Sequence, residues 1–103
     1  MKYGTTAAFD ADVRRLPKSE YRLFRSVLRE AFIPAAERRA ADPASPWPRG
    51  LRAKRVEGSP GIWEMTWSFS GPDGRATFEW VDIEGEPAIR WRRVGGNAIF
   101  RTP

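Results

Sequence analysis

The first third of the chain has the hydrophobic spacing of helices. Phe9, Val13 and Leu16 follow one another at intervals of four and three residues, which places them on one face of a short helix. Pro17 is expected to end this helix because proline has no backbone N–H to donate. Ser19 then has a side chain suited to capping the start of a second helix.

The second predicted helix is longer and strongly amphipathic. Its apolar face consists of Tyr21, Phe24, Leu28, Phe32 and Ala35. The arginines that lie away from that face are Arg22, Arg25 and Arg29. Pro34 is expected to kink or split the helix, since its ring clashes with the preceding turn.

After a proline-rich loop over residues 42–50, the pattern changes to the two-residue alternation of strands. The predicted strands are Leu51–Val56, Ile62–Phe69, Arg75–Ile83 and Ala88–Val94, with Met1–Gly4 as a candidate edge strand. Glycine and proline predict turns at Ser70–Gly74 and Glu84–Pro87.

These elements predict an α+β fold in a single domain over residues 1–103. Two N-terminal helices would pack on one face of a three- to four-stranded antiparallel sheet, and the other face would stay partly open. A chain of 103 residues is long enough for one hydrophobic core but not for two.

The amino-acid composition limits which catalytic groups and which partners this chain can use. The chain has no Cys and no His, which excludes disulfides and removes the commonest general base and metal ligand. Its net charge is +5, and residues 1–50 carry most of the excess, with ten basic and six acidic side chains. Such a charge favours an acidic partner. Without an apolar run of membrane-span length or a signal-peptide pattern, the sequence predicts a soluble, cytoplasmic protein with no membrane partner.

The last predicted strand and the residues after it carry the most distinctive polar pattern. The side chains concerned are Arg90, Arg92 and Arg93, then Asn97 and Phe100 beyond a Gly-Gly turn. Guanidinium groups bind phosphate oxygens in a bidentate way, so the end of this strand can hold a phosphate. The alternative is an edge strand whose arginines only keep the sheet in solution.

Four segments follow one another in an order that is typical of one protein family. They are Leu51–Gly58, Trp63–Trp67, Arg75–Phe78 and Arg93–Phe100. In order and spacing they resemble the RelE/ParE superfamily of toxin–antitoxin toxins, and most closely its RelE, YafQ and HigB ribonuclease branch. The last segment is similar to the family's closing pattern of arginine, apolar residue, glycine, small residue, histidine and aromatic residue. The resemblance implies a RelE-like, microbial-ribonuclease-like fold.

The resemblance also implies a function. Toxins of this branch cleave mRNA, often in the ribosomal A site, by attack of the RNA 2′-hydroxyl on its own phosphate, and they use no metal and no cofactor. The implied partners are a cognate antitoxin protein, mRNA and the ribosome. The implied state is a monomer or weak dimer.

Several residues match positions at which the family carries catalytic groups. By this resemblance Arg93 faces the scissile phosphate, and Lys54 contacts the phosphate or acts as a base. Arg75 matches a basic residue at the start of the strand after the turn, and Asn97 occupies the position of the family's histidine. For each basic residue the alternative is a solvated or scaffolding side chain.

The implied substrate-binding residues are Arg52, Arg90, Arg92 and Phe100. Arg52 would face the same way as Lys54 at a spacing of two residues and add positive charge. Phe100 matches the family's closing aromatic residue, which positions a base. Its alternative role is to plug the core.

Two departures leave the activity open. Asn97 can donate a hydrogen bond but cannot transfer a proton. Glu64 falls where many relatives have arginine, and it either pairs across strands with Arg75 or Arg92 or serves as a carboxylate base beside Lys54. The chain is therefore a nuclease that uses lysine and arginine, an inactive domain that binds nucleic acid or antitoxin, a ParE-like gyrase inhibitor, or a form inactivated by substitution at Asn97.

Overall fold

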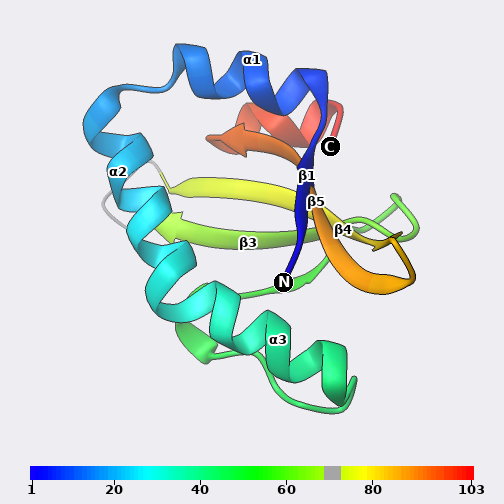
Figure 1. Ribbon diagram of the computed structural model, residues 1–103. Helices are drawn as coiled ribbons and strands as arrows, with labels where there is room; N and C mark the ends of the chain where they lie inside the picture. Colours follow the sequence, from blue (N-terminus) through cyan, green and yellow to red (C-terminus); the bar gives the residue numbers. More distant parts are fainter. Residues whose placement is uncertain (69–72) are drawn as a thin grey trace.

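The computed structural model describes residues 1–68 and 73–103, and it has an α+β fold (Figure 1). Its strands are β1 (Tyr3–Thr5), β2 (Lys54–Arg55), β3 (Trp63–Ser68), β4 (Gly74–Ile83) and β5 (Glu86–Gly95). Its helices are α1 (Ala7–Arg15), α2 (Lys18–Val27) and α3 (Ile33–Ala41), with a π-helical turn η1 (Leu28–Phe32) and short 3-10 turns η2 (Arg49–Leu51) and η3 (Asn97–Arg101). Most of the turn predicted at Ser70–Gly74, and Phe69 before it, lie outside the described residues.

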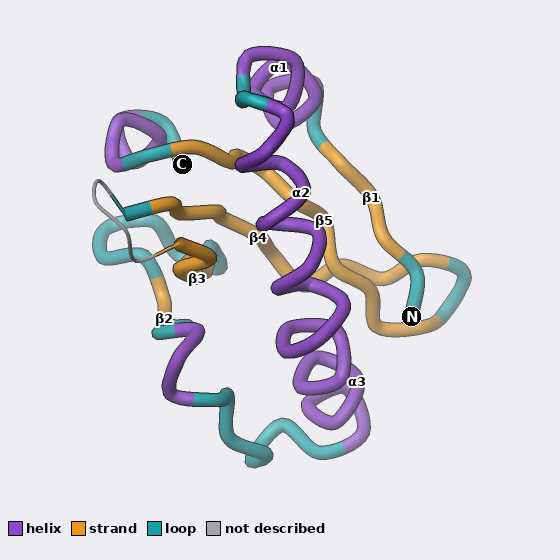
Figure 2. Tube along the Cα trace, turned by 90° about the vertical axis from the view of Figure 1, so that its left-hand side faces the viewer, coloured by secondary structure: helices purple, strands orange, loops and turns teal. Residues whose placement is uncertain are grey.

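The five strands seen in the described residues lie in the order β1-β5-β4-β3-β2 (Figure 2). β1 runs parallel to β5, and the other neighbours are antiparallel. The prediction of a three- to four-stranded, purely antiparallel sheet is therefore wrong. Tight turns force β4 and β5 to be antiparallel, whereas the helices between β1 and the later strands leave β1 free to join in the parallel direction.

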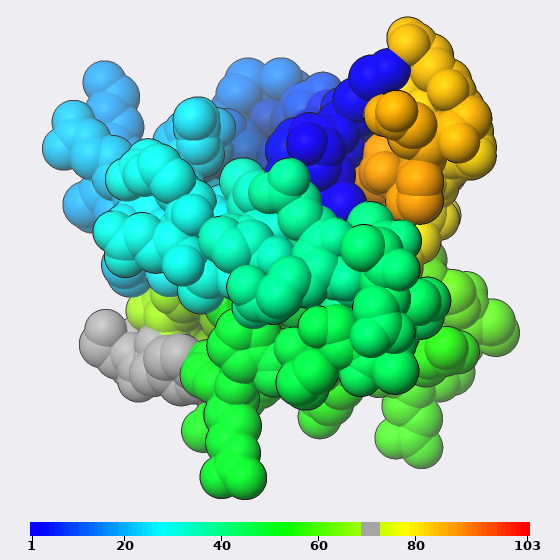
Figure 3. Space-filling model, turned by 60° about the horizontal axis from the view of Figure 1, so that its bottom comes forward, coloured from blue at the N-terminus to red at the C-terminus, as the bar shows by residue number. Residues whose placement is uncertain are grey.

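α2 and α3 cover one face of the sheet. α1 follows directly after the short edge strand β1 and packs against β5 (Figures 1 and 2). The core between the layers is aromatic. Phe32 is fully buried and contacts Phe78 and Trp91 with ring centroids 5.0 and 4.8 Å apart. Figure 3 shows α3 with β1 and the β4–β5 turn beside it. None of the helices in the described ranges is long and apolar enough to cross a membrane.

The predicted interruption at Pro34 takes the form of a wide turn. The chain passes from α2 into α3 through η1, and the Ile33 N–H donates to the Leu28 carbonyl five residues back. Pro34 follows in the first turn of α3 and, because it has no N–H, cannot donate to a carbonyl of the preceding turn. α2, η1 and α3 therefore form one continuous helix, which is wider over the π-helical turn.

The helix starts differ from one of the sequence expectations. Ser19 does not cap α2, which begins directly after Pro17 without a side-chain cap. Proline can precede a helix without a capping side chain because its dihedral angles are already restricted. Thr6 instead caps α1, where its hydroxyl accepts a hydrogen bond from the Phe9 N–H at 3.1 Å.

The predicted strand Leu51–Val56 shrinks to the two residues of β2. Leu51 is buried at the end of η2, and Arg52 follows in the left-handed conformation with φ 46° and ψ 40°. Arg52 therefore does not continue the alternation of Lys54, and the expectation that both side chains face the same way at a two-residue spacing is wrong. Burial of Leu51 in the core outweighs the strand preference of this segment.

The β4–β5 hairpin is tighter than the predicted turn Glu84–Pro87. Ile83 pairs with Glu86, so only Glu84 and Gly85 form the turn, with φ values of 54° and 81°. Two positive φ angles in succession suit the right-handed twist of the hairpin. Further along, Phe78 pairs with Trp91 while Thr77 pairs with Arg93, so Arg92 is an extra residue in a bulge.

Replacing Gly74 by alanine is expected to destabilise the fold by about 1–3 kcal/mol. A Cβ atom at Gly74 would lie 2.6 Å from the ring of Trp67, which is itself fixed by a hydrogen bond to the Arg75 carbonyl. Gly50→Ala is the matched control, because no atom lies within 4 Å of its Cβ position. Urea unfolding of both variants checks this prediction, and equal stability of the two would contradict it.

Candidate functional site

The face of the sheet that points away from α2 and α3 carries a row of polar side chains. Lys54 pairs with Glu64, Glu64 with Thr77, and Thr77 with Arg93. Directly paired residues point to the same side of a sheet, so these four side chains share one cross-strand row. We call this surface, with Arg75, Glu79, Arg90 and Arg92 beside the row, the polar face.

Glu64 and Arg75 form an ion pair at the centre of the polar face. The Arg75 Nη1 atom donates to Glu64 Oε1 at 3.0 Å, and both side chains are mostly buried. The predicted cross-strand pairing of Glu64 is thus confirmed, with Arg75 as the partner. A second guanidinium nitrogen of Arg75 lies 3.6 Å from the Asp73 carboxylate. The pair sets a carboxylate and a cation side by side.

Phe100 lies next to this ion pair. The turn η3 brings its half-buried ring to 5.9 Å from the Arg75 guanidinium carbon. A ring so placed can contribute a cation–π contact and still offer an edge or face to a planar ligand. Phe100 is therefore neither a fully buried core plug nor fully solvent-exposed.

Arg90 and Arg92 share one acidic partner. Glu79 Oε2 accepts from Arg90 Nε at 3.1 Å and from Arg92 Nη1 at 2.8 Å. Burial acts to raise the pKa of the Glu79 carboxyl, but the hydrogen bonds from the two arginines outweigh it and hold the pKa below its usual value. Glu79 therefore neutralises part of the charge that the sequence assigned to phosphate binding.

Arg93 forms an ion pair with Asp12 of α1. Its Nε and Nη2 atoms donate to the two Asp12 oxygens at 2.7 and 3.1 Å, and its Nη1 donates to the Thr102 carbonyl at 3.0 Å. The Val94 N–H also donates to Asp12, at 3.1 Å. Burial acts to raise the pKa of Asp12, but these bonds outweigh it and lower that pKa, and the hydrogen bond to Asp12 raises the pKa of Arg93.

The remaining predicted residues are exposed. Lys54 makes no ion pair or hydrogen bond with the described part of the chain. Asn97 begins η3, and its side chain makes no hydrogen bond to any described residue. Arg52 lies in the turn before β2 rather than on the strand. The fold therefore gathers Lys54 with the predicted strand arginines and leaves Arg52 out of the row.

Sequence reasoning missed the acidic and main-chain partners of the polar face. Glu79 was detectable, because a hairpin centred on Glu84-Gly85 sets it opposite Arg90. Asp12 gave no such signal, because 81 positions separate it from Arg93. The last residues also return over the face, where the Pro103 carbonyl accepts from Thr77 and Arg92.

The arginines and Lys54 of the polar face can bind an anion, and its carboxylates can accept a proton. Within residues 1–68 and 73–103, no group of three or more acidic side chains is placed to hold a metal ion. Comparison with protein families, curated proteins and solved structures finds no match to this chain.

Proposed function

We propose that the chain is a metal-independent endoribonuclease that cleaves mRNA, inhibits translation and binds RNA on the polar face. The observation that carries the proposal is the adjacency of Lys54 and Glu64 in one row, with the Arg75 guanidinium 3.0 Å from Glu64. Cleavage of RNA by its own 2′-hydroxyl needs a base, cations on the phosphate and a proton donor. The resemblance to the RelE, YafQ and HigB toxins supports the same chemistry.

In the proposed reaction, Glu64 keeps its pair with Arg75 through Oε1 and takes the proton of the RNA 2′-hydroxyl on its other oxygen, Oε2. The 2′-oxygen forms a bond to phosphorus while the bond from phosphorus to the 5′-oxygen breaks, and the Lys54 ammonium gives a proton to that leaving oxygen. Arg75 stabilises the charge on the phosphoryl oxygens. The products are a 2′,3′-cyclic phosphate and a 5′-hydroxyl.

Three further side chains take supporting roles in this proposal. Phe100 stacks on a base next to the cleaved bond, a contact worth about 1–3 kcal/mol. Arg93 makes three hydrogen bonds to Asp12 and Thr102, and two of its five N–H groups remain for a phosphate oxygen. Asn97 serves as a hydrogen-bond donor in place of a proton donor.

Induced expression in a bacterial host tests the proposal, with growth and mapped mRNA 5′ ends as readouts. We expect growth arrest and new cuts within open reading frames, together with cyclic-phosphate ends when the purified chain cuts RNA in a chelator. Asn97→His, expressed in parallel, should cut faster because a histidine can transfer a proton. The absence of cuts with both forms would overturn the proposal.

A non-cleaving binding domain is the second candidate, and one observation favours it. Arg75, Arg90, Arg92 and Arg93 each have a carboxylate partner, which reduces the charge left for a transferring phosphate. Growth arrest without RNA cuts would support this candidate, and a supercoiling assay would then test inhibition of DNA gyrase. In either case we propose an antitoxin with an acidic segment as the partner of this +5 chain.

A further inference from the structure

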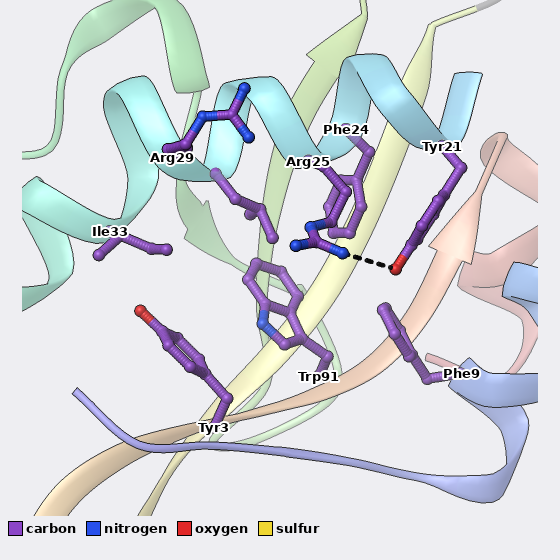
Figure 4. A pocket seen from close by; sticks show the side chains of 9 residues that line it. Tyr3, Phe9, Tyr21, Phe24, Arg25, Arg29, Ile33 and Trp91 are labelled. Atoms are coloured by element: carbon purple, nitrogen blue, oxygen red, sulfur yellow. Dashed lines mark hydrogen bonds between the residues drawn. The ribbon is translucent and has the colours of Figure 1, made fainter. Parts of the chain in front are cut away.

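A cavity of about 380 Å³ lies on the helix side of the sheet, away from the polar face (Figure 4). It opens between the α2–η1 segment and the β1–β5 edge. Its inner wall is aromatic, with Phe24 and Trp91 nearly perpendicular at 5.4 Å and Phe9 6.2 Å from Phe24. This volume falls within the range of small-molecule sites, and such walls suit a flat ring.

The rim of the cavity is basic. Arg25 and Arg29 line it from α2 and η1, four residues apart on one helix face. Arg25 points into the opening and donates to the Tyr21 hydroxyl at 3.3 Å (Figure 4). Neither arginine forms an ion pair with a carboxylate in the described residues, unlike the four arginines of the polar face.

Like charges four residues apart on a helix are destabilising, so an anion that both arginines contact would stabilise the fold. The backbone of the wall that carries Arg29 is also unusual, because Leu28 and Arg29 lie in the π-helical turn η1. Such turns cost helical stability and occur frequently at functional sites. The aromatic interior, two arginines with no carboxylate partner among the described residues and the π-helical turn occur together at this cavity.

We propose that this cavity binds a small ligand made of a planar aromatic ring with one anionic group. The ring would lie between Tyr3 and Tyr21, above the buried Phe24 and Trp91 that form the floor of the cavity, and the anionic group would contact Arg25 and Arg29 at the rim. The site uses none of the polar-face residues, so the proposal does not depend on RNA cleavage. An aryl carboxylate and a nucleoside monophosphate share the required chemistry, and the experiment separates them.

Titration of the full chain by calorimetry and NMR tests the site with three probes: 2-naphthoate, guanosine 5′-monophosphate and neutral 2-naphthalenemethanol. We expect at least one anionic probe to bind with a Kd below about 1 mM and to shift the Trp91 indole resonance but not that of Trp80. The neutral ring should bind at least about tenfold more weakly. Preference for naphthoate or for the nucleotide assigns the ligand class.

Substitutions on α2 provide the matched comparison. Arg25→Gln should weaken binding about tenfold, whereas Arg22→Gln should leave it unchanged because Arg22 does not line the cavity. Both side chains are exposed, so both variants should fold, and Arg29→Gln offers a second test at the rim. The proposal fails if no anionic probe shifts Trp91, or if Arg22→Gln weakens binding as much as Arg25→Gln.

Discussion

Replacing Lys54 by methionine is expected to slow RNA cleavage by about 10²–10³-fold and to leave the stability of the fold unchanged. In the proposed reaction Lys54 supplies both a cation at the phosphate and the proton for the leaving oxygen. Its side chain makes no ion pair or hydrogen bond within the described residues, so its loss removes no structural contact. Single-turnover cleavage of a defined RNA, with a melting curve of the same sample, measures both effects.

Arg55→Met is the control for this prediction. Arg55 is adjacent on β2, is also basic and exposed, and points to the other face, where it stacks on Trp63 with its guanidinium carbon 5.3 Å from the ring centre. Its loss should change cleavage less than about threefold, since it does not share the row of Glu64. Equal loss in both variants would mean that positive charge in general, rather than Lys54 itself, supports the activity.

Replacing Asp12 by alanine is expected to destabilise the protein by about 3 kcal/mol and to lower its Tm by more than about 10 °C. The Asp12 carboxylate is 7% exposed and accepts hydrogen bonds from Arg93, the Val94 N–H and Arg15. Without it, the Arg93 guanidinium keeps only the Thr102 carbonyl, and the Val94 N–H loses its partner. Urea unfolding at neutral pH measures the loss.

The stabilising effect of Asp12 should depend on pH. Its pKa is lower in the folded protein than in the unfolded chain, so its contribution is present above the unfolded pKa and is lost as the pH falls through the folded value. The stability difference between the wild-type chain and Asp12→Ala should be full above about pH 5 and shrink below about pH 4. A difference that stays constant down to pH 2 would contradict the ion-pair explanation.

Asp10→Ala is the control for helix effects at Asp12. Asp10 is exposed in the first turn of the same helix, where a carboxylate contributes only about 0.3–1 kcal/mol through the helix dipole. A loss of similar size in both variants would assign the effect to helix propensity. A much larger loss of unfolding free energy in Asp12→Ala would show that the Asp12–Arg93 ion pair holds α1 against β5.

Local pattern predicted most of the elements. The spacing of Phe24 and Phe32 predicted a buried helix face, and both rings are buried in the core. The alternation around Met65 predicted β3, whose Met65 and Trp67 face the core while Glu64 faces the other side. These features were readable because helix and strand periodicity act over a few residues.

The candidate site was only partly predictable. Sequence pattern and resemblance together singled out Lys54, Arg75 and Arg93, and strand register places all three on one face of the sheet. The same reasoning placed Arg52 on a strand, because it could not weigh the burial of Leu51 against strand preference.

The sequence by itself therefore determined the α+β class, the helix and strand faces and the basic character of the last strand, because short-range periodicity and charge are written in neighbouring residues. Tertiary structure alone decided the parallel pairing of β1 with β5, the Asp12–Arg93 ion pair and the aromatic cavity beneath Arg25. Each of these joins segments far apart in the chain. Their geometry follows from how whole elements pack, and no local pattern encodes it.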